Sequence, residues 1–143
     1  MQGAKRSTAV VMSLAAFGAL LLIVLLVAFG PSLGSVFVGD MRATASAVRT
    51  GPDYGLTVQL NYTGLYEAGN VQIVSATLND VTPVTPLPVE LGEMAPNRPK
   101  SAVLRFAAPT EAPGSRARLM LRTRWHILGG PKEARQVIEI QLP

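Results

Sequence analysis

The hydrophobic pattern divides the chain into one continuous apolar segment and a longer region in which apolar and polar positions alternate. Residues 9–29 are almost entirely Ala, Val, Leu, Ile, Met, Phe and Gly, and no charged side chain occurs between residues 7 and 39. A helix of about 21 residues is about 32 Å long, enough to cross the ~30 Å hydrocarbon core of a bilayer. The pattern therefore predicts a transmembrane helix over residues 7–30, after a short N-terminus (1–6) and before a linker (31–40).

Beyond residue 40 the period changes to two, which is typical of half-buried β-strands. Apolar residues alternate with polar ones from Met41 to Ala47 and from Leu56 to Tyr62, and the segment from Val71 to Leu78 changes phase after Ile73, as a β-bulge would produce. Four further strands are expected at 89–91, 102–106, 117–127 and 136–142. Turn clusters rich in Gly and Pro separate them. These seven short strands predict a mainly β domain over residues 41–143, an antiparallel immunoglobulin-like (Ig-like) β-sandwich.

Part of this domain resembles a known family. The segment Leu91-Gly92-Glu93-Met94-Ala95-Pro96, followed by the alternating residues 102–106, is similar to a turn and strand of bacterial CARDB-type, adhesion-related Ig-like domains. Residues 60–78 resemble a strand–turn–strand unit of the same domains, and the likeness, which covers about residues 40–143, departs at Asn97, where those domains usually have glycine. The resemblance implies a display or binding module and no particular ligand, because a fold does not fix a function.

The apolar segment has two interpretations. Lys5 and Arg6 in front of it also match a secretory signal peptide, which would be removed, but the apolar run exceeds the 7–15 residues usual for such signals. Its length therefore favours a retained anchor. Because both basic residues precede the helix, the positive-inside rule predicts a cytoplasmic N-terminus, an anchor in the cell (inner) membrane and a periplasmic or extracellular β-domain.

One face of the predicted helix carries small side chains. Ala15, Gly18, Ala19 and Leu22 follow the i, i+3, i+4, i+7 spacing, so a neighbouring membrane helix could approach closely there. Exposure to lipid on all sides is the alternative. The span holds no ionisable residue, which argues against an ion or proton path.

The sequence contains no pattern typical of a catalytic, metal or cofactor site. The chain has no cysteine, which excludes disulfides, thiolate catalysis and Cys-ligated metals. The single histidine, His126, lies on a predicted strand with no Ser, Asp or Glu at a spacing typical of a triad or a zinc site. We therefore expect neither an enzyme nor a small-molecule substrate.

The net charge of +4 is unevenly distributed. Residues 36–93 contain two Arg against six acids, whereas residues 96–143 contain nine Lys or Arg against three acids. This separation favours an oriented surface field over nucleic-acid binding.

The basic half contains the sharpest candidate surface. If Trp125 points into the core with Leu119, Leu121 and Ile127, then the other set of side chains on that strand points outward. That set comprises Arg116, Arg118, Met120, Arg122, Arg124 and His126. One interpretation is a solvated face whose arginines are offset by cross-strand pairing with Glu139. The other is a docking surface for an acidic partner or for anionic head groups, because Arg and Met are enriched in protein interfaces and basic side chains are attracted to anionic lipid.

The first functional hypothesis is a non-enzymatic accessory or scaffolding subunit of a larger membrane complex, of a kind recruited by bioenergetic and light-harvesting assemblies. Its partners would be the membrane and other membrane-protein subunits. The alternative is a membrane-anchored binding or adhesion module that acts alone on a cell-envelope protein or polysaccharide. A pilin-like filament subunit is a more remote alternative, because pilins ordinarily carry a Glu near the start of the mature helix and none occurs here.

Overall fold

The computed structural model describes residues 17–21, 23, 39–108 and 112–143. The chain divides into two units, Met1–Val36 and Phe37–Pro143. In the first unit, residues 17–21 and 23 are helical. No helix within the described ranges has both the length and the apolar character needed to cross a membrane. The other residues of the predicted span, residues 1–6 and most of the predicted linker lie outside the described residues, so the anchor stays a prediction.

The second unit consists of seven strands, which match the seven segments predicted from the sequence. In chain order they are β1 (Met41–Thr50), β2 (Asp53–Tyr62), β3 (Ala68–Leu78), β4 (Val89–Met94), β5 (Lys100–Ala107), β6 (Arg116–Ile127) and β7 (Gly130–Gln141). Most of them extend further than the alternation indicated, because backbone pairing continues past the last regularly alternating residue. β1 and β2, for example, stay paired as far as Thr50 and Asp53.

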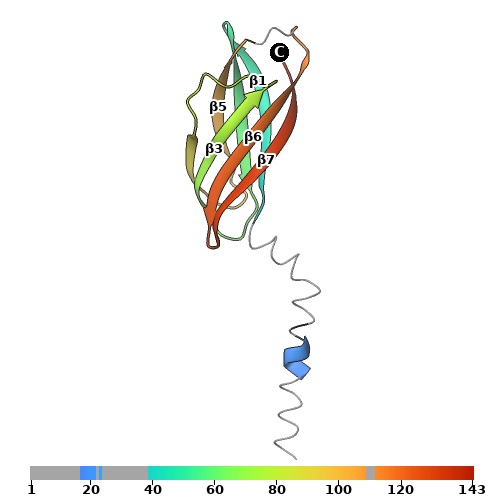
Figure 1. Ribbon diagram of the computed structural model, residues 1–143, viewed down its shortest axis with the longest axis vertical. Coiled ribbons are helices and arrows are strands. Elements are labelled where there is room, and N and C mark those ends of the chain that lie inside the picture. The colour runs from blue at the N-terminus through green and yellow to red at the C-terminus, as the bar shows by residue number, and fades with distance from the viewer. Residues whose placement is uncertain (1–16, 22, 24–38, 109–111) are drawn as a thin grey trace, which may run out of the picture. The chain divides into compact units, whose positions relative to one another are not determined.

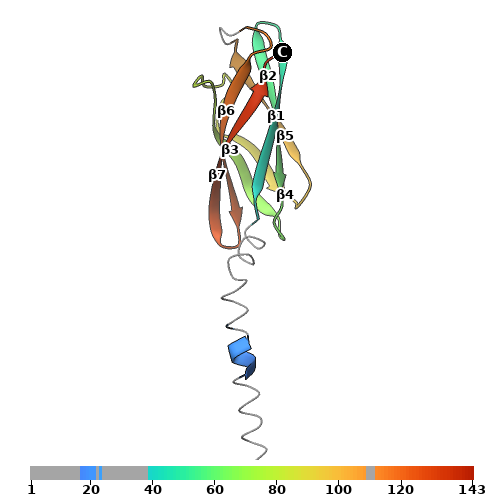
Figure 2. The ribbon, with the colours of Figure 1, turned by 90° about the vertical axis from the view of Figure 1, so that its right-hand side faces the viewer.

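The strands form two antiparallel sheets, β1-β2-β5 and β4-β3-β6-β7. In Figure 1, β6 and β7 form a long hairpin, and Figure 2 shows β3, β6 and β7 in a layer apart from β1 and β5. The expected mainly β fold of seven strands in two antiparallel sheets is thus confirmed. The constant-type immunoglobulin arrangement places the fourth strand in the sheet of the first, second and fifth. Here β4 instead pairs with β3.

The core lies between the sheets and uses the inward positions of both. β2 contributes Leu56, Val58 and Leu60, and β6 contributes Leu119 and Leu121, all of them buried in one apolar cluster. Successive residues of a strand point to opposite faces, so this alternation directs every second side chain inward.

The phase change expected in β3 is confirmed. Val71 and Ile73 are buried before it, and Ala76 and Leu78 are buried after it. The pairing of β3 with β6 shifts between Ile73 and Ser75, as a bulge requires. The bulge keeps apolar side chains in the core on both sides of the shift.

Gln136 of β7 joins the two sheets along one side of the sandwich. Its Oε1 accepts a hydrogen bond from the Ala43 backbone N–H at 2.8 Å, and its Nε2 donates to the Met41 carbonyl at 2.5 Å. β1 is an edge strand, and edge strands present unpaired backbone groups that invite pairing with other chains. Gln136 occupies two of these groups and so protects part of the edge.

The turns gather at two ends of the sandwich. Pairing of Met41 with Tyr62, of Ala68 with Met94 and of Ile127 with Gly130 fixes the directions of the strands. The end at which the chain enters β1 therefore also holds turns 63–67, 95–99 and 128–129, and we call it the proximal end. The C-terminus lies at the opposite, distal end (Figure 1).

Candidate interaction surface

The structure places the sequence-predicted outward residues of β6 on one face of the four-stranded sheet. Arg116, Arg118, Met120 and His126 are exposed, whereas Arg122 and Arg124 are partly buried. The positions between them are buried, and they comprise Ala117, Leu119, Leu121, Thr123 and Trp125. Because β6 lies between β3 and β7, its outward side chains have neighbours on both sides.

Each outward residue of β6 faces a defined residue of β7. Arg118 pairs with Glu139, Met120 with Val137, Arg122 with Arg135 and Arg124 with Glu133. Directly opposite residues of antiparallel strands share a face and have Cβ atoms about 5 Å apart. The outer face of β6 and β7 therefore combines the predicted arginines with further charged and apolar side chains from β7.

Arg124 and Glu133 form an ion pair on this face. Nη2 and Nε of Arg124 donate to the same carboxylate oxygen of Glu133, at 2.6 and 2.9 Å. The hydrogen bond from Arg124 holds the pKa of Glu133 below its usual range, while desolvation opposes that shift. The positive charges of Arg122 and Arg135 also favour the ionised carboxylate.

Glu139, the offset expected from the sequence, lies opposite Arg118 as alternation requires. Among the described residues, however, no ion pair joins the two within 4.0 Å; the ion pairs are Arg42 with Asp40, Arg105 with Asp53, and Arg124 with Glu133. The acid that offsets an arginine of β6 is therefore Glu133, which the sequence analysis did not single out. Both acids lie directly opposite an arginine in the register of β6 and β7, but only Glu133 comes within ion-pairing distance of its arginine.

Four residues at the centre of the face form what we call the arginine–methionine patch: Met120, Arg122, Arg135 and Val137. Arg122 and Arg135 are directly opposite one another, an arrangement of like charges that disfavours the fold. Met120 and Val137, the adjacent pair, remain 40% and 62% exposed. A shallow, mainly apolar hollow of about 330 Å³ lies over these residues and reaches Ser75 and Thr77 of β3.

Two polar atoms in this hollow have no partner. Arg122 Nε and Thr77 Oγ1 are shielded from solvent and make no hydrogen bond to any described residue. Most polar groups at such positions in native proteins are paired, because losing water without a new hydrogen bond is unfavourable. The hollow over the patch therefore combines unpaired polar atoms, unbalanced positive charge and exposed apolar surface.

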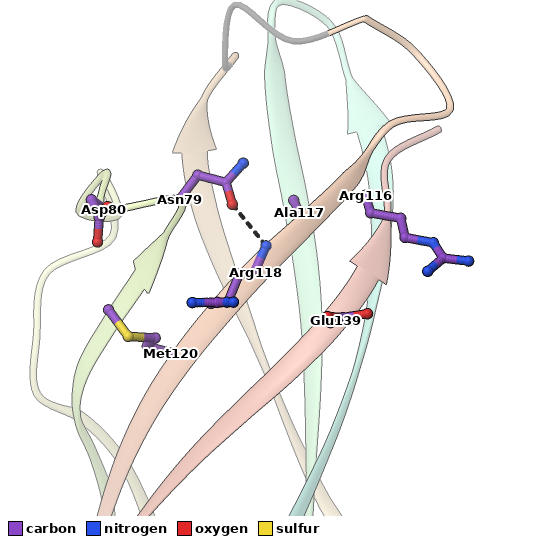
Figure 3. A pocket seen from close by; sticks show the side chains of 7 residues that line it. All are labelled: Asn79, Asp80, Arg116, Ala117, Arg118, Met120 and Glu139. Atoms are coloured by element: carbon purple, nitrogen blue, oxygen red, sulfur yellow. Dashed lines mark hydrogen bonds between the residues drawn. The ribbon is translucent and has the colours of Figure 1, made fainter.

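A second hollow, of about 380 Å³, lies next to the patch towards the distal end (Figure 3). Here the Arg118 backbone N–H donates to Asn79 Oδ1 at 2.8 Å, and the Asn79 N–H donates to the Arg118 carbonyl at 2.9 Å. These bonds hold the turn after β3 against β6. Figure 3 shows the side chains of Arg116 and Arg118 extending in different directions from β6, so their charges diverge.

The remaining candidates have simpler positions. Gly18 and Ala19 of the predicted helix-packing face are helical and exposed, while Ala15 and Leu22 lie outside the described residues. His126 is exposed near the proximal end of β6, opposite Pro131. Within the part of the chain that the structure describes, no group of three His, Asp or Glu side chains could hold a metal ion.

Sequence reasoning missed Arg135 and Val137, which complete the patch. Both belong to a run of alternating residues, from Glu133 to Glu139, that marks β7 as a strand with one outward face. The run does not show which residue of β6 lies opposite each position of β7, because this register depends on the length of the β6–β7 turn.

No model of a known protein family matches this chain, and no curated protein matches it closely enough to count as a relative. The resemblance to CARDB-type domains accordingly stays a prediction.

Proposed function

We propose that this protein is a non-enzymatic accessory subunit of a larger membrane complex. In this proposal a single N-terminal helix anchors it in the membrane, and an extracytoplasmic Ig-like sandwich binds an acidic surface of a partner subunit. The arginine–methionine patch is the observation that carries the proposal. The apolar segment of residues 9–29 supports the anchor.

Each part of the patch fits a protein contact with acidic side chains. Two arginines that lie opposite each other can bind one or two carboxylates, because the planar guanidinium donates paired hydrogen bonds to a carboxylate. Burial of Met120 and Val137 against a partner would remove exposed apolar surface from water. Methionine and arginine are also among the residues enriched at interfaces.

The outer face of the other sheet also carries arginines and an exposed valine, namely Arg42, Arg105 and Val103. There, however, each of the two arginines has an acidic partner, Asp40 or Asp53, and neither lies opposite another arginine. The shallow depression on that face is lined by uncharged residues. This contrast supports the β6–β7 face as the one that binds a partner.

The test is a paired charge reversal in the full chain. Arg122→Glu with Arg135→Glu should lower recovery of partner subunits from gently solubilised native membranes by about tenfold or more, since close interfacial charge pairs contribute more than ~1.5 kcal/mol each. Recovery by the unmodified chain should fall as salt is raised. Quantitative mass spectrometry of the co-purified proteins gives the measurement.

The matched control is Arg42→Glu with Arg49→Glu, which changes charge equally on exposed positions of β1 in the other sheet. Circular dichroism should show that both variants keep the β fold. Equal partner recovery by the patch variant and the control would reduce the patch to a solvated face. Purification of the unmodified chain without any partner would favour the alternative of a binding module that acts alone.

A further inference from the structure

The large apolar side chains that stay exposed on the sandwich differ in kind between its regions. On the sheet faces and in the turn after β3 they are valines and Met120. The leucines and the aromatic residue in this set are Leu65, Tyr66 and Leu128, with exposures of 55%, 57% and 91%. All three lie in the turns of the proximal end.

The fold does not explain why an exposed leucine stands at position 128. With Gly129 it makes the two-residue connection of the β6–β7 hairpin, between the paired residues Ile127 and Gly130. Such positions favour Gly, Asn, Asp or Ser, which supply turn geometry or local hydrogen bonds. A leucine that is 91% exposed adds almost no core packing.

Leu65 and Tyr66 lie beside the point where the chain arrives from the apolar segment. The Thr63 backbone N–H donates to the Asp40 carbonyl at 3.0 Å, and the Asp40 N–H donates to Thr63 Oγ1 at 3.3 Å. The turn of residues 63–67 is therefore tied to the residues that lead into β1. It also neighbours the hairpin tip, since the start of β3 at Gly69 pairs with the end of β6 at His126.

The length of the connection limits where this end can lie. Ten residues separate Phe29, the last of the apolar segment, from Asp40, and they can span at most about 35 Å. The proximal end can therefore lie against the surface of the membrane that the apolar segment is proposed to cross. Its turns expose both Arg98 and Glu67, which line one hollow, so the exposed apolar side chains and not net charge are what a membrane would take up at this end.

We propose that the proximal end rests on the lipid surface, with Leu65, Tyr66 and Leu128 inserted into the interfacial region of the bilayer. Tyrosine is enriched at that depth because its ring is apolar and its hydroxyl is hydrated. Leucines at turn tips gain by leaving water for the boundary of the acyl chains. This inference rests on the proposed function, which makes the apolar segment a membrane anchor.

The absence of cysteine from the sequence allows a direct test by single-site labelling of the full chain. Leu65→Cys and Leu128→Cys, each carrying the fluorophore NBD, are reconstituted into vesicles of phosphatidylcholine and phosphatidylglycerol. Both labels should emit at a shorter wavelength than the same fluorophore in buffer. Nitroxides attached to the lipids should quench these two labels several times more strongly than they quench labels at control positions. Iodide in the water should quench them less.

The matched controls are Val103→Cys on the outer face of β5 and Val84→Cys in the turn after β3, since the native residues are 58% and 63% exposed. Equal quenching by iodide at all four positions would overturn the proposal. Shielding of residues 65 and 128 in native membranes but not in pure lipid vesicles would also overturn it, because a protein would then cover this end.

An alkaline carbonate wash of the same vesicles separates this inference from the proposed function. A chain that stays in the vesicles while its labels at 65 and 128 remain in water retains its anchor and refutes only the lipid contact. A chain that is released by the wash refutes the anchor, and the lipid contact fails with it.

Discussion

The tightest constraint on single residues surrounds Tyr62, whose ring fills space left by two glycines. A Cβ on Gly64 would overlap the Tyr62 ring and hydroxyl, and a Cβ on Gly39 would lie 2.6 Å from the ring. Gly39 also has a φ of 69°, which favours glycine. Tyr62 is fully buried, and this burial raises the pKa of its hydroxyl.

Gly64→Ala should therefore lower the free energy of unfolding by about 1–3 kcal/mol, the usual effect of forcing extra volume into a packed site. The buried ring cannot move aside as an exposed side chain would. Urea unfolding of the purified chain, followed by circular dichroism, measures the change.

Gly129→Ala serves as the control, because a Cβ there meets no atom within 4 Å. Its unfolding free energy should stay within about 1 kcal/mol of the unmodified value, or rise slightly because alanine restricts the unfolded chain. Indistinguishable midpoints for the two variants would contradict the packing of Tyr62 between the glycines.

Among the elements, β6 combines the core with the candidate surface. Trp125 is 4% exposed on its inward side, so Trp125→Ala should remove about 3–5 kcal/mol from the stability of the sandwich. That is a large part of the stability of a small domain. Thermal and urea unfolding by circular dichroism would show it, and an unchanged melting temperature would mean that the inward side of β6 is assigned wrongly.

Thr123→Val on the same inward side provides the contrast. Thr123 is 1% exposed, and its hydroxyl makes no hydrogen bond to any residue that the structure describes. Since burial of an unpaired hydroxyl disfavours folding by about 1–3 kcal/mol, the valine variant should be as stable as the unmodified protein or more so. Loss of stability in both variants would indicate a general sensitivity of β6 to substitution.

Asn97 lies in the turn between β4 and β5 and has a φ of 56°. This is the left-handed region, which glycine and asparagine adopt most readily. Asparagine therefore fits the backbone conformation of this turn.

At the scale of the whole molecule, the uneven charge along the chain becomes an uneven charge in space. Four of the nine basic residues after Pro96 lie on β6, and Arg135 joins them from β7. Because these strands form a hairpin, five of those nine basic residues share one sheet face. Under the proposed function, this face would attract an acidic partner.

Membrane retention is the prediction that concerns the whole chain. Protease added to spheroplasts should degrade the sandwich and leave the N-terminal segment in the membrane, because Lys5 and Arg6 in front of the proposed anchor predict a cytoplasmic N-terminus. Immunoblotting against tags at the two termini distinguishes the fragments. A soluble mature form that begins near Ser35 would contradict this prediction and identify residues 1–34 as a cleaved signal peptide.

The sequence alone determined the number of strands, the buried side of β1, β2, β3 and β6, and the phase change in β3. Alternation has an unambiguous meaning in a β-strand, because every second side chain leaves the same face. It determined in the same way that the arginines of β6 point outward together with Met120. These features are local, and they are encoded within a few consecutive residues.

Only the tertiary structure decided which residues lie opposite one another. The register between β6 and β7 places Arg122 against Arg135 and Glu133 against Arg124, and a shift of one residue would have turned each side chain of β7 to the other face. The sheet topology likewise decides three other features. β4 lies beside β3, Gln136 joins the two sheets, and Leu65 and Leu128 come together at one end. These features join residues far apart in the sequence, and no local pattern specifies such contacts.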